Sequence, residues 1–333
     1  MPRARVVLNP LSGHAVSTTE LLRLLRPLRE AGWETTVVQT DGRGNGTALA
    51  REAVREGFDV VVAAGGDGTI NEVIQALVGT PVALAVLPLG TGNVWAHEVG
   101  IPVDLAGAVR VILDGRVRRV DVGSAGTRYF LLMAGIGYDA EVTGTTDAQA
   151  KRKLGRLAYI VRGVTVALSF RGHRATIDVD GKRAQCRALL IVIGNTRRYG
   201  GPVSVTAEAR IDDGLLDVCV FKGVGALQSA RYAAEVLLGR HLRDPGVSYF
   251  RAASLTVSSD PPLLVQVDGD TIGKTPMVFR VHTRALNVIV PRQARWHLFG
   301  TAGITDRLQG REGERTSDDS HEDRLHNRPR ERG

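Results

Sequence analysis

The segment from Gly65 to Glu72 combines the residue types that phosphate binding needs. It reads GGDGTINE and follows an apolar run at residues 60–64. Glycines let the backbone approach a polyphosphate closely, and the amides of a helix beginning here would supply N–H donors. Asp67 can reach a magnesium ion beside the phosphates, and Thr69 and Asn71 add hydroxyl and amide contacts. The motif predicts a nucleotide phosphate site; the alternative is a glycine-rich turn that binds nothing.

Three other parts of the chain lie at the ends of strand-like runs and fit the same phosphate site. Asn9–Gly13 reads NPLSG after the first apolar run, and residues 87–93 read LPLGTGN, with Thr91 between two glycines. Thr40 ends another strand-like run. Each alone also suits an ordinary turn. Together they suit one nucleotide crevice, because the carboxyl ends of parallel strands meet at one edge of a sheet.

Two other nucleotide motifs are disfavoured. The Walker A pattern, GxxxxGK followed by Ser or Thr, does not occur in the chain, which argues against a P-loop kinase. Residues 135–140 read GIGYDA and match the dinucleotide pattern GxGxxA. This match falls late, in a β-rich region, and lacks a βαβ unit whose next strand ends in an acidic residue. A Rossmann oxidoreductase is therefore the weaker interpretation.

The first 120 residues alternate strand-like and helix-like patterns. Strands are predicted at 4–10, 33–40, 59–66 and 82–90, and helices at 17–32, 47–57, 69–79 and 105–115. Such βαβ alternation favours a largely parallel sheet covered on both faces. We therefore predict an α/β nucleotide-binding domain over residues 1–120.

The remaining chain has a different texture. Residues 121–299 contain short apolar runs separated by turn residues, and this pattern predicts a β-rich, mostly antiparallel second domain that binds the substrate. Helical patterns interrupt it at Lys151–Ser169 and Leu227–Leu242. Residues 300–333 are polar with few apolar residues, which predicts a disordered tail.

Composition narrows the class of partner. The formal net charge of +8 suits anionic lipid surfaces, nucleotides or nucleic acid. An aromatic content of 5% argues against a stacking surface for nucleic acid, so no nucleic-acid partner is expected. Cys186 and Cys219 lie in apolar runs and are expected to be buried free thiols.

Membrane contact, if any, is expected to be peripheral. No apolar run approaches the roughly 20 residues of a membrane span, and the first residues lack the apolar region of a signal peptide. A cytoplasmic protein that visits the inner membrane surface transiently is expected. Candidate contact surfaces are the basic residues at 151–156 and the basic helix at 227–243; the alternative is a solvated face.

The glycine motifs resemble a known family. NPLSG, GGDGTINEV and LPLGTGN, in this order and spacing, resemble the diacylglycerol kinase catalytic-domain superfamily, which includes bacterial soluble lipid kinases, sphingosine kinases and ceramide kinases. The similarity continues through FLLMAGIGYDAEV, IGNTRRYGGP, ARIDDGLLDVCVF and QVDGD, from Arg5 to about Pro291. GGDGT alone is shared with NAD kinases, whereas LPLGTGN and DDGLLDV favour the lipid kinases.

The resemblance implies an active site in a cleft between the two domains. It places ATP on Thr40, Gly65, Gly66, Asp67, Gly68, Thr69, Ile70, Asn71 and Thr91. It also implies a structural magnesium in the second domain, held by the Asp213 carboxylate and the backbone carbonyls of Arg210 and Leu215, an oxygen set that suits a hard cation. The alternative is an acidic turn that binds nothing.

The family has a catalytic carboxylate in a DGE motif, and this chain departs from it. The corresponding residues are Asp268-Gly269-Asp270, so the usual Glu is one methylene shorter. Asp270 is the expected base and Asp67 the second candidate; a solvated hairpin turn is the alternative.

We therefore expect an ATP- and Mg²⁺-dependent lipid kinase that phosphorylates a hydroxyl of diacylglycerol or a related lipid. A kinase of soluble substrates similar to NAD kinase is the enzymatic alternative. A regulator that binds nucleotide or lipid without turnover is the other, favoured by the shortened Asp270. The oligomeric state stays open between a monomer and a homodimer.

Overall fold

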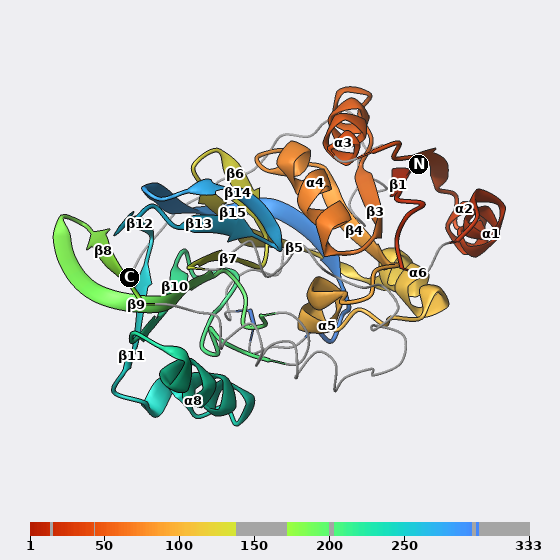
Figure 1. Ribbon diagram of the computed structural model, residues 1–333. Helices are drawn as coiled ribbons and strands as arrows, with labels where there is room; N and C mark the ends of the chain where they lie inside the picture. Colours follow the sequence, from red (N-terminus) through yellow and green to blue (C-terminus); the bar gives the residue numbers. More distant parts are fainter. Residues whose placement is uncertain (14–15, 43, 138–171, 200–202, 295–297, 300–333) are drawn as a thin grey trace, which may run out of the picture.

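The first domain is built on four parallel strands. The computed structural model describes residues 1–13, 16–42, 44–137, 172–199, 203–294 and 298–299. Strands β1 (Arg3–Leu8), β2 (Glu34–Gln39), β3 (Val60–Gly65) and β4 (Ala83–Pro88) pair in the order β4-β3-β1-β2 (Figure 1). All residues of β3 and β4 are buried, which explains their uninterrupted apolar sequences. The predicted parallel sheet is confirmed.

Six helices accompany this sheet. They are α1 (Thr18–Leu24), α2 (Arg26–Glu30), α3 (Asn45–Arg55), α4 (Asp67–Leu77), α5 (Val94–Val99) and α6 (Leu105–Asp114). Helix α3 packs against α4, whereas α1 and α2 pack against α6. The single helix predicted for 17–32 is in fact two, because Pro27 lacks the amide that a continuous helix needs and therefore occupies the first turn of α2.

The second domain is β-rich and antiparallel, as predicted. Its strands are β5 (Arg116–Ala125), β6 (Arg128–Phe130), β7 (Met133–Ile136), β8 (His173–Val179), β9 (Lys182–Gly194), β10 (Leu216–Lys222), β11 (Val247–Ala252), β12 (Ser254–Asp260), β13 (Leu264–Val267), β14 (Asp270–Lys274) and β15 (Met277–Val290). Helix α8 (Ala226–Leu237) and a short 3-10 helix (His241–Arg243) follow β10. The helix predicted at 151–169, the end of the GIGYDA motif and the predicted tail lie outside the described residues.

Strand β15 joins the two domains. It pairs antiparallel with β12 and β5, and its residues Asn287 and Val288 pair in parallel with β4. Strand β5 itself runs without a break past residue 120, where we placed the boundary between the domains. One hydrogen-bonded sheet therefore extends through both domains and joins them.

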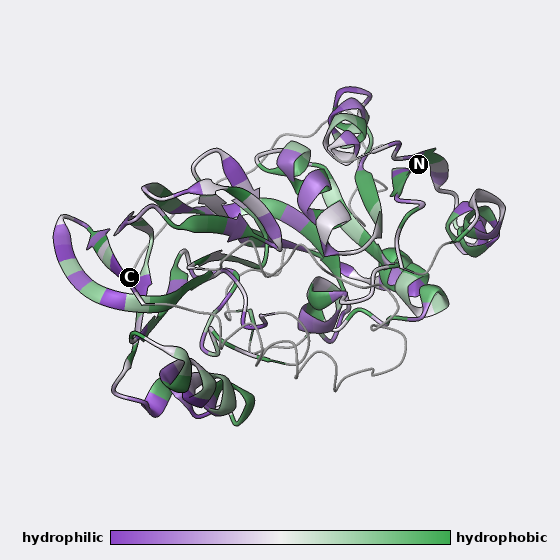
Figure 2. Cartoon of the chain, viewed as in Figure 1, coloured by the Kyte–Doolittle hydropathy of each residue, from purple (hydrophilic) through white to green (hydrophobic). Residues whose placement is uncertain are grey.

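The buried residues form two apolar clusters. One centres on the first domain and reaches β9 and β10, and the other lies inside the second domain. Apolar residues accordingly dominate the inner strands (Figure 2). Both cysteines are free; Cys219 is fully buried as predicted, but Cys186 is only partly buried, because it lies on β9 where that strand leaves the core. Within the described ranges, none of the helices has the length and apolar character to cross a membrane.

Candidate active site

Three loops meet at the carboxyl ends of the parallel strands. The Asn9 side chain after β1 donates its Nδ2 hydrogen to the Thr69 hydroxyl at 3.2 Å. A Cβ added at Gly13 would lie 2.7 Å from the Thr91 hydroxyl. Thr40 adjoins them, because its amide donates to the carbonyl of Leu8 at the end of β1. The loops that sequence analysis grouped therefore lie side by side.

Two glycine backbones contact each other closely. A Cβ on Gly90 would lie 2.5 Å from the Cα of Gly66, and a Cβ on Gly65 would lie 2.2 Å from the Thr69 hydroxyl. No side chain fits at Gly90 unless the two loops separate. The exposed Gly68, by contrast, has no atom within 4 Å of its added Cβ. The result is a cradle of bare backbone beside open space, which suits an extended polyphosphate.

Asp67 has a structural role that we did not predict from its glycine neighbours. Its carboxylate accepts hydrogen bonds from the amides of Val94 and Trp95, both at 3.0 Å. It thereby caps the first turn of α5, where backbone amides would otherwise lack acceptors. The side chain is only partly buried, so each oxygen keeps lone-pair capacity toward the loops. Ile70, in contrast, is a core side chain that can offer a ligand only its backbone.

Asn71 connects the glycine motif to the second domain. Its Nδ2 group donates to Asp268 Oδ2 at 2.8 Å and to the carbonyl of Tyr129 at 3.1 Å. Its Oδ1 accepts a 2.6 Å hydrogen bond from Arg128 Nη2. We expected Asn71 to contact ATP, but its side chain is buried and occupied by these partners. It thereby joins α4 to β6, which carries Arg128, and to the turn before β14, which carries Asp268.

Asp268 is the centre of this junction. Its two oxygens accept the amides of Leu131, Leu132 and Met133 at 2.9–3.0 Å, in addition to Asn71. Burial raises the pKa of the Asp268 carboxyl to about 6, and these hydrogen bonds act in the opposite direction. The first Asp of the DGD segment is therefore a positioning residue that holds β7 and α4 together.

The raised pKa of Asp268 predicts a pH-dependent stability. The folded protein binds this proton more tightly than the unfolded chain, so the contribution of Asp268 to stability is complete below about pH 4 and is lost as pH rises to about 6. We expect the unfolding free energy of the wild type, relative to Asp268→Asn, to increase by up to about 3 kcal/mol between pH 6 and pH 4. Urea denaturation at both pH values measures this; a constant difference would contradict the raised pKa.

Asp270 lies at a pocket between the domains. The pocket has a volume of about 480 Å³ and is lined by Gly44, Glu72, Thr127, Arg128, Asp270, Thr271 and Ile272. Asp270 begins β14, and Arg128, which also holds Asn71, lies in the same pocket. A carboxylate and a guanidinium at one pocket can accept a proton and bind an anion, respectively.

Glu72 organises the entrance to this pocket. Its carboxylate accepts the amides of Gly44 and Gly46 at 2.7 and 2.9 Å, and its backbone carbonyl accepts the Thr47 hydroxyl at 2.8 Å. These contacts fix the start of α3 against α4. Glu72 belongs to the GGDGTINE motif, yet sequence reasoning gave it no role.

The predicted magnesium turn directly precedes β10. Asp213 Oδ1 accepts the amide of Leu215 at 3.1 Å, and the turn is held by the Gly214 amide, which donates to Asp121 at 2.6 Å. Burial is the main cause that raises the pKa of both Asp213 and Asp121. Neighbouring carboxylates raise these two pKa values further, and hydrogen bonds lower them. Nearby, one buried oxygen of Asp217 has no hydrogen-bond partner.

These observations test whether the turn suits a cation. Asp212 and Asp213 both raise the pKa of Asp121, so negative charge gathers at this carboxylate, whereas Arg251 and Arg210 oppose the effect of Asp212 on the pKa of Asp213. Carboxylate and carbonyl oxygens of this kind are the ligands that a hard cation takes. In the described part of the chain, no group of three or more His, Cys, Asp or Glu side chains is arranged for a metal. The expected set differs from such a group, because it consists of one carboxylate and the carbonyls of Arg210 and Leu215. The residues therefore fit the ion, and its binding stays a prediction.

Both halves of the chain match models of known protein domains. Residues 3–125 match the model of the diacylglycerol kinase catalytic domain, and residues 133–290 match the YegS C-terminal NAD kinase beta sandwich-like domain. The chain is 32% identical over 296 residues to a diacylglycerol kinase of Bacillus subtilis strain 168, covering 88% of this chain and 98% of that protein. It is 33% identical over 291 residues to one of Staphylococcus aureus strain JH9, covering 87% and 92%.

A solved structure agrees with these matches. A diacylglycerol kinase from Bacillus anthracis strain Sterne superposes with a TM-score of 0.71 at 25% identity, covering 87% of this chain and 97% of that one. Sequence and structure therefore give the same answer over both domains: the chain belongs to the diacylglycerol kinase family of kinases.

Proposed function

We propose that this protein transfers the γ-phosphate of ATP to a hydroxyl of diacylglycerol or a related lipid. The observation that carries the proposal is the meeting of three glycine loops at one sheet edge, next to a pocket that contains Asp270 and Arg128. Phosphoryl transfer asks a protein mainly to position reactants and to neutralise charge. The glycine loops would position the triphosphate, and Arg128 in the pocket would neutralise negative charge.

The loops would hold the triphosphate through backbone amides. Gly65, Gly66 and Gly68 carry no side chain that would cover the backbone, and the start of α4 adds amide donors with positive potential, whereas the Gly90 amide donates to Asn93 Oδ1 at 2.9 Å. Mg²⁺ bound with ATP would neutralise phosphate charge, and the partly exposed Asp67 is the carboxylate positioned to hold it. The same carboxylate fixes α5, which keeps the loop at 90–93 in place.

Asp270 would act as the base. As the lipid hydroxyl oxygen bonds to the γ-phosphorus, the Asp270 carboxylate takes the hydroxyl proton, and the bond between the γ-phosphorus and the bridging oxygen of ADP breaks. Arg128 would offer its remaining N–H groups to the transferred phosphoryl, while its contact with Asn71 fixes its position.

The acceptor can be tested directly. Purified protein is incubated with γ-labelled ATP and Mg²⁺, and with either extracted lipids or NAD. Label that enters the lipid phase supports the proposal, whereas label on NAD would establish the soluble-substrate alternative. If neither product forms although Mg·ATP binds, the protein is a non-catalytic nucleotide-binding regulator.

Helix α8 has the surface expected for membrane contact on the cytoplasmic side. Val224, Leu227, Leu237 and Leu238 are 57%, 86%, 45% and 66% exposed, and they make up four of the seven exposed large apolar residues in the described chain. On this helix Leu227, Arg231, Ala234 and Leu238 recur at helical spacing, and exposed Arg240 and Arg243 follow. Apolar side chains flanked by arginine suit an anionic lipid surface.

We predict that Leu227→Glu weakens binding to anionic vesicles about 10- to 100-fold, because burying one leucine in lipid contributes about 1.5–3 kcal/mol. Co-sedimentation measures the binding. Val103→Glu is the matched control, since Val103 is 52% exposed and lies outside α8. Activity on a water-soluble short-chain diacylglycerol should be unchanged in both variants. Equal vesicle binding by the two would remove α8 as the contact surface.

A further inference from the structure

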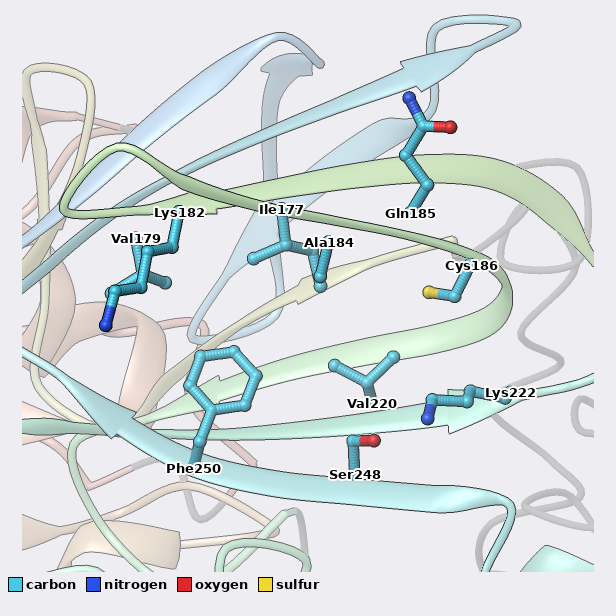
Figure 3. Close-up of a pocket in the computed structure, with 10 residues that line it drawn as sticks. All are labelled: Ile177, Val179, Lys182, Ala184, Gln185, Cys186, Val220, Lys222, Ser248 and Phe250. Carbon is cyan, nitrogen blue, oxygen red and sulfur yellow. The ribbon is translucent and has the colours of Figure 1, made fainter.

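A second pocket lies inside the substrate domain, between two pairs of strands. Strands β8 and β9 form a hairpin on one side, and β10 and β11 pair on the other; the later half of β9 hydrogen-bonds to β10 and connects the two. Between them is a pocket of about 430 Å³ (Figure 3). It shares no lining residue with the pocket at Asp270. The volume is in the range of small-molecule sites.

The centre of this pocket is apolar. Its lining residues are Ile177, Val179, Lys182, Ala184, Gln185, Cys186, Val220, Lys222, Ser248 and Phe250. Ile177, Val220 and Phe250 point toward the space between the two pairs of strands (Figure 3). The pocket is thus an open continuation of the second domain's core, where an alkyl chain would replace water on apolar surface.

The charged side chains that line this pocket in the described chain are basic. Lys182 and Lys222 lie toward opposite ends of the apolar surface (Figure 3), and among the described residues that line the pocket none is acidic. The chain has only five lysines among 43 basic residues, so two at one pocket are conspicuous. Asp178 and Arg183 of the same hairpin pair with each other at 2.8 Å and are not part of the lining. An ammonium group at the end of an apolar pocket suits an anionic head group.

We propose that this pocket binds a single-chain anionic amphiphile. The alkyl chain would lie on Ile177, Val220 and Phe250, and a carboxylate or phosphate head group would meet Lys222 or Lys182. The site is separate from the pocket at Asp270 and would let a free fatty acid or a lysophospholipid bind to the second domain. A nucleotide suits the pocket poorly, because the described lining offers a base or sugar few uncharged polar side chains, those of Gln185 and Ser248.

Cys186 allows a test in the intact protein. It lines the pocket, whereas Cys219, the only other cysteine, is fully buried. Burial raises the pKa of the Cys186 thiol and nearby Lys222 lowers it, so labelling with a disulfide reagent is followed at mildly alkaline pH. Dodecanoate and dodecyl phosphate, each below its micelle concentration, should slow this reaction at least about tenfold at saturation. The two compounds distinguish a carboxylate from a phosphate head group.

The controls separate the site from general partitioning of alkyl chains. Dodecyltrimethylammonium should protect Cys186 little, and Lys182→Glu and Lys222→Glu should each raise the concentration of anion needed for protection. Lys274→Glu is the matched charge change on exposed β14, outside this pocket, and should have no effect. Cys186→Ser confirms which thiol is followed, and circular dichroism confirms folding. Equal protection by cation and anion, no protection, or equal effects of the three lysine variants would overturn the proposal. If a Glu variant does not fold, the Gln variants replace it.

Discussion

Gly90→Ala is expected to weaken binding of Mg·ATP about 10- to 100-fold while the protein remains folded. The added Cβ would lie 2.5 Å from the Cα of Gly66, and two backbones must then move apart. Relieving such a clash typically costs about 1–3 kcal/mol, which corresponds to this range of affinity. Isothermal titration calorimetry with Mg·ATP measures the effect. The loss occurs because the cradle is made of backbone, whose shape cannot adjust by a change of rotamer.

Two further glycine variants grade this prediction. Gly65→Ala places its Cβ 2.2 Å from the Thr69 hydroxyl and 2.6 Å from Thr69 Cβ, which moves only with the backbone of α4, so its effect should be of similar size. Gly225→Ala is the control, because its Cβ meets nothing within 4 Å and its backbone is extended, with φ of −156°. If Gly90→Ala bound ATP as tightly as Gly225→Ala does, the loops would not be the nucleotide site.

The parts of the site that sequence predicted are those governed by local constraints. A bare backbone at Gly65 and Gly66 after an apolar strand follows from the sequence around it, and parallel strand order then brings the other loops to the same edge. The break at Pro27 was readable in principle by the same kind of local reasoning, because a proline inside a helical pattern removes a backbone donor.

The contacts that were not predicted join residues far apart in the chain. Asn71 and Asp268 are separated by 197 positions, and Asp67 caps a helix that begins 27 residues later. That helix, α5, has six residues, which is too short to show a helical period. Strand β14 and the first half of β15 contain many polar residues, and their strand conformation is fixed by pairing with β13, β12 and β5.

Removing the carboxylate at position 270 is expected to lower kcat for lipid phosphorylation about 10²- to 10⁴-fold in Asp270→Asn, the range typical of a general base. Mg·ATP affinity should change little, because Gly65, Gly66 and Gly90 are not among the residues that line the pocket of Asp270. Asp180→Asn is the matched control: Asp180 is exposed at the turn between β8 and β9, where φ is 51° and Asn is tolerated. Steady-state kinetics on mixed micelles give both parameters.

Asp270→Glu tests the shortened side chain itself. If Asp270 is the base, the Glu variant should retain most of the activity or raise it, because the longer side chain restores the usual reach of the family motif. A Glu variant as inactive as Asn, with its fold and ATP affinity intact, would show that a carboxylate at this distance is not the base, and Asp67 would take that role. Asp67→Asn then becomes the decisive variant, since it keeps one oxygen to accept an amide at the start of α5 while it removes the charge.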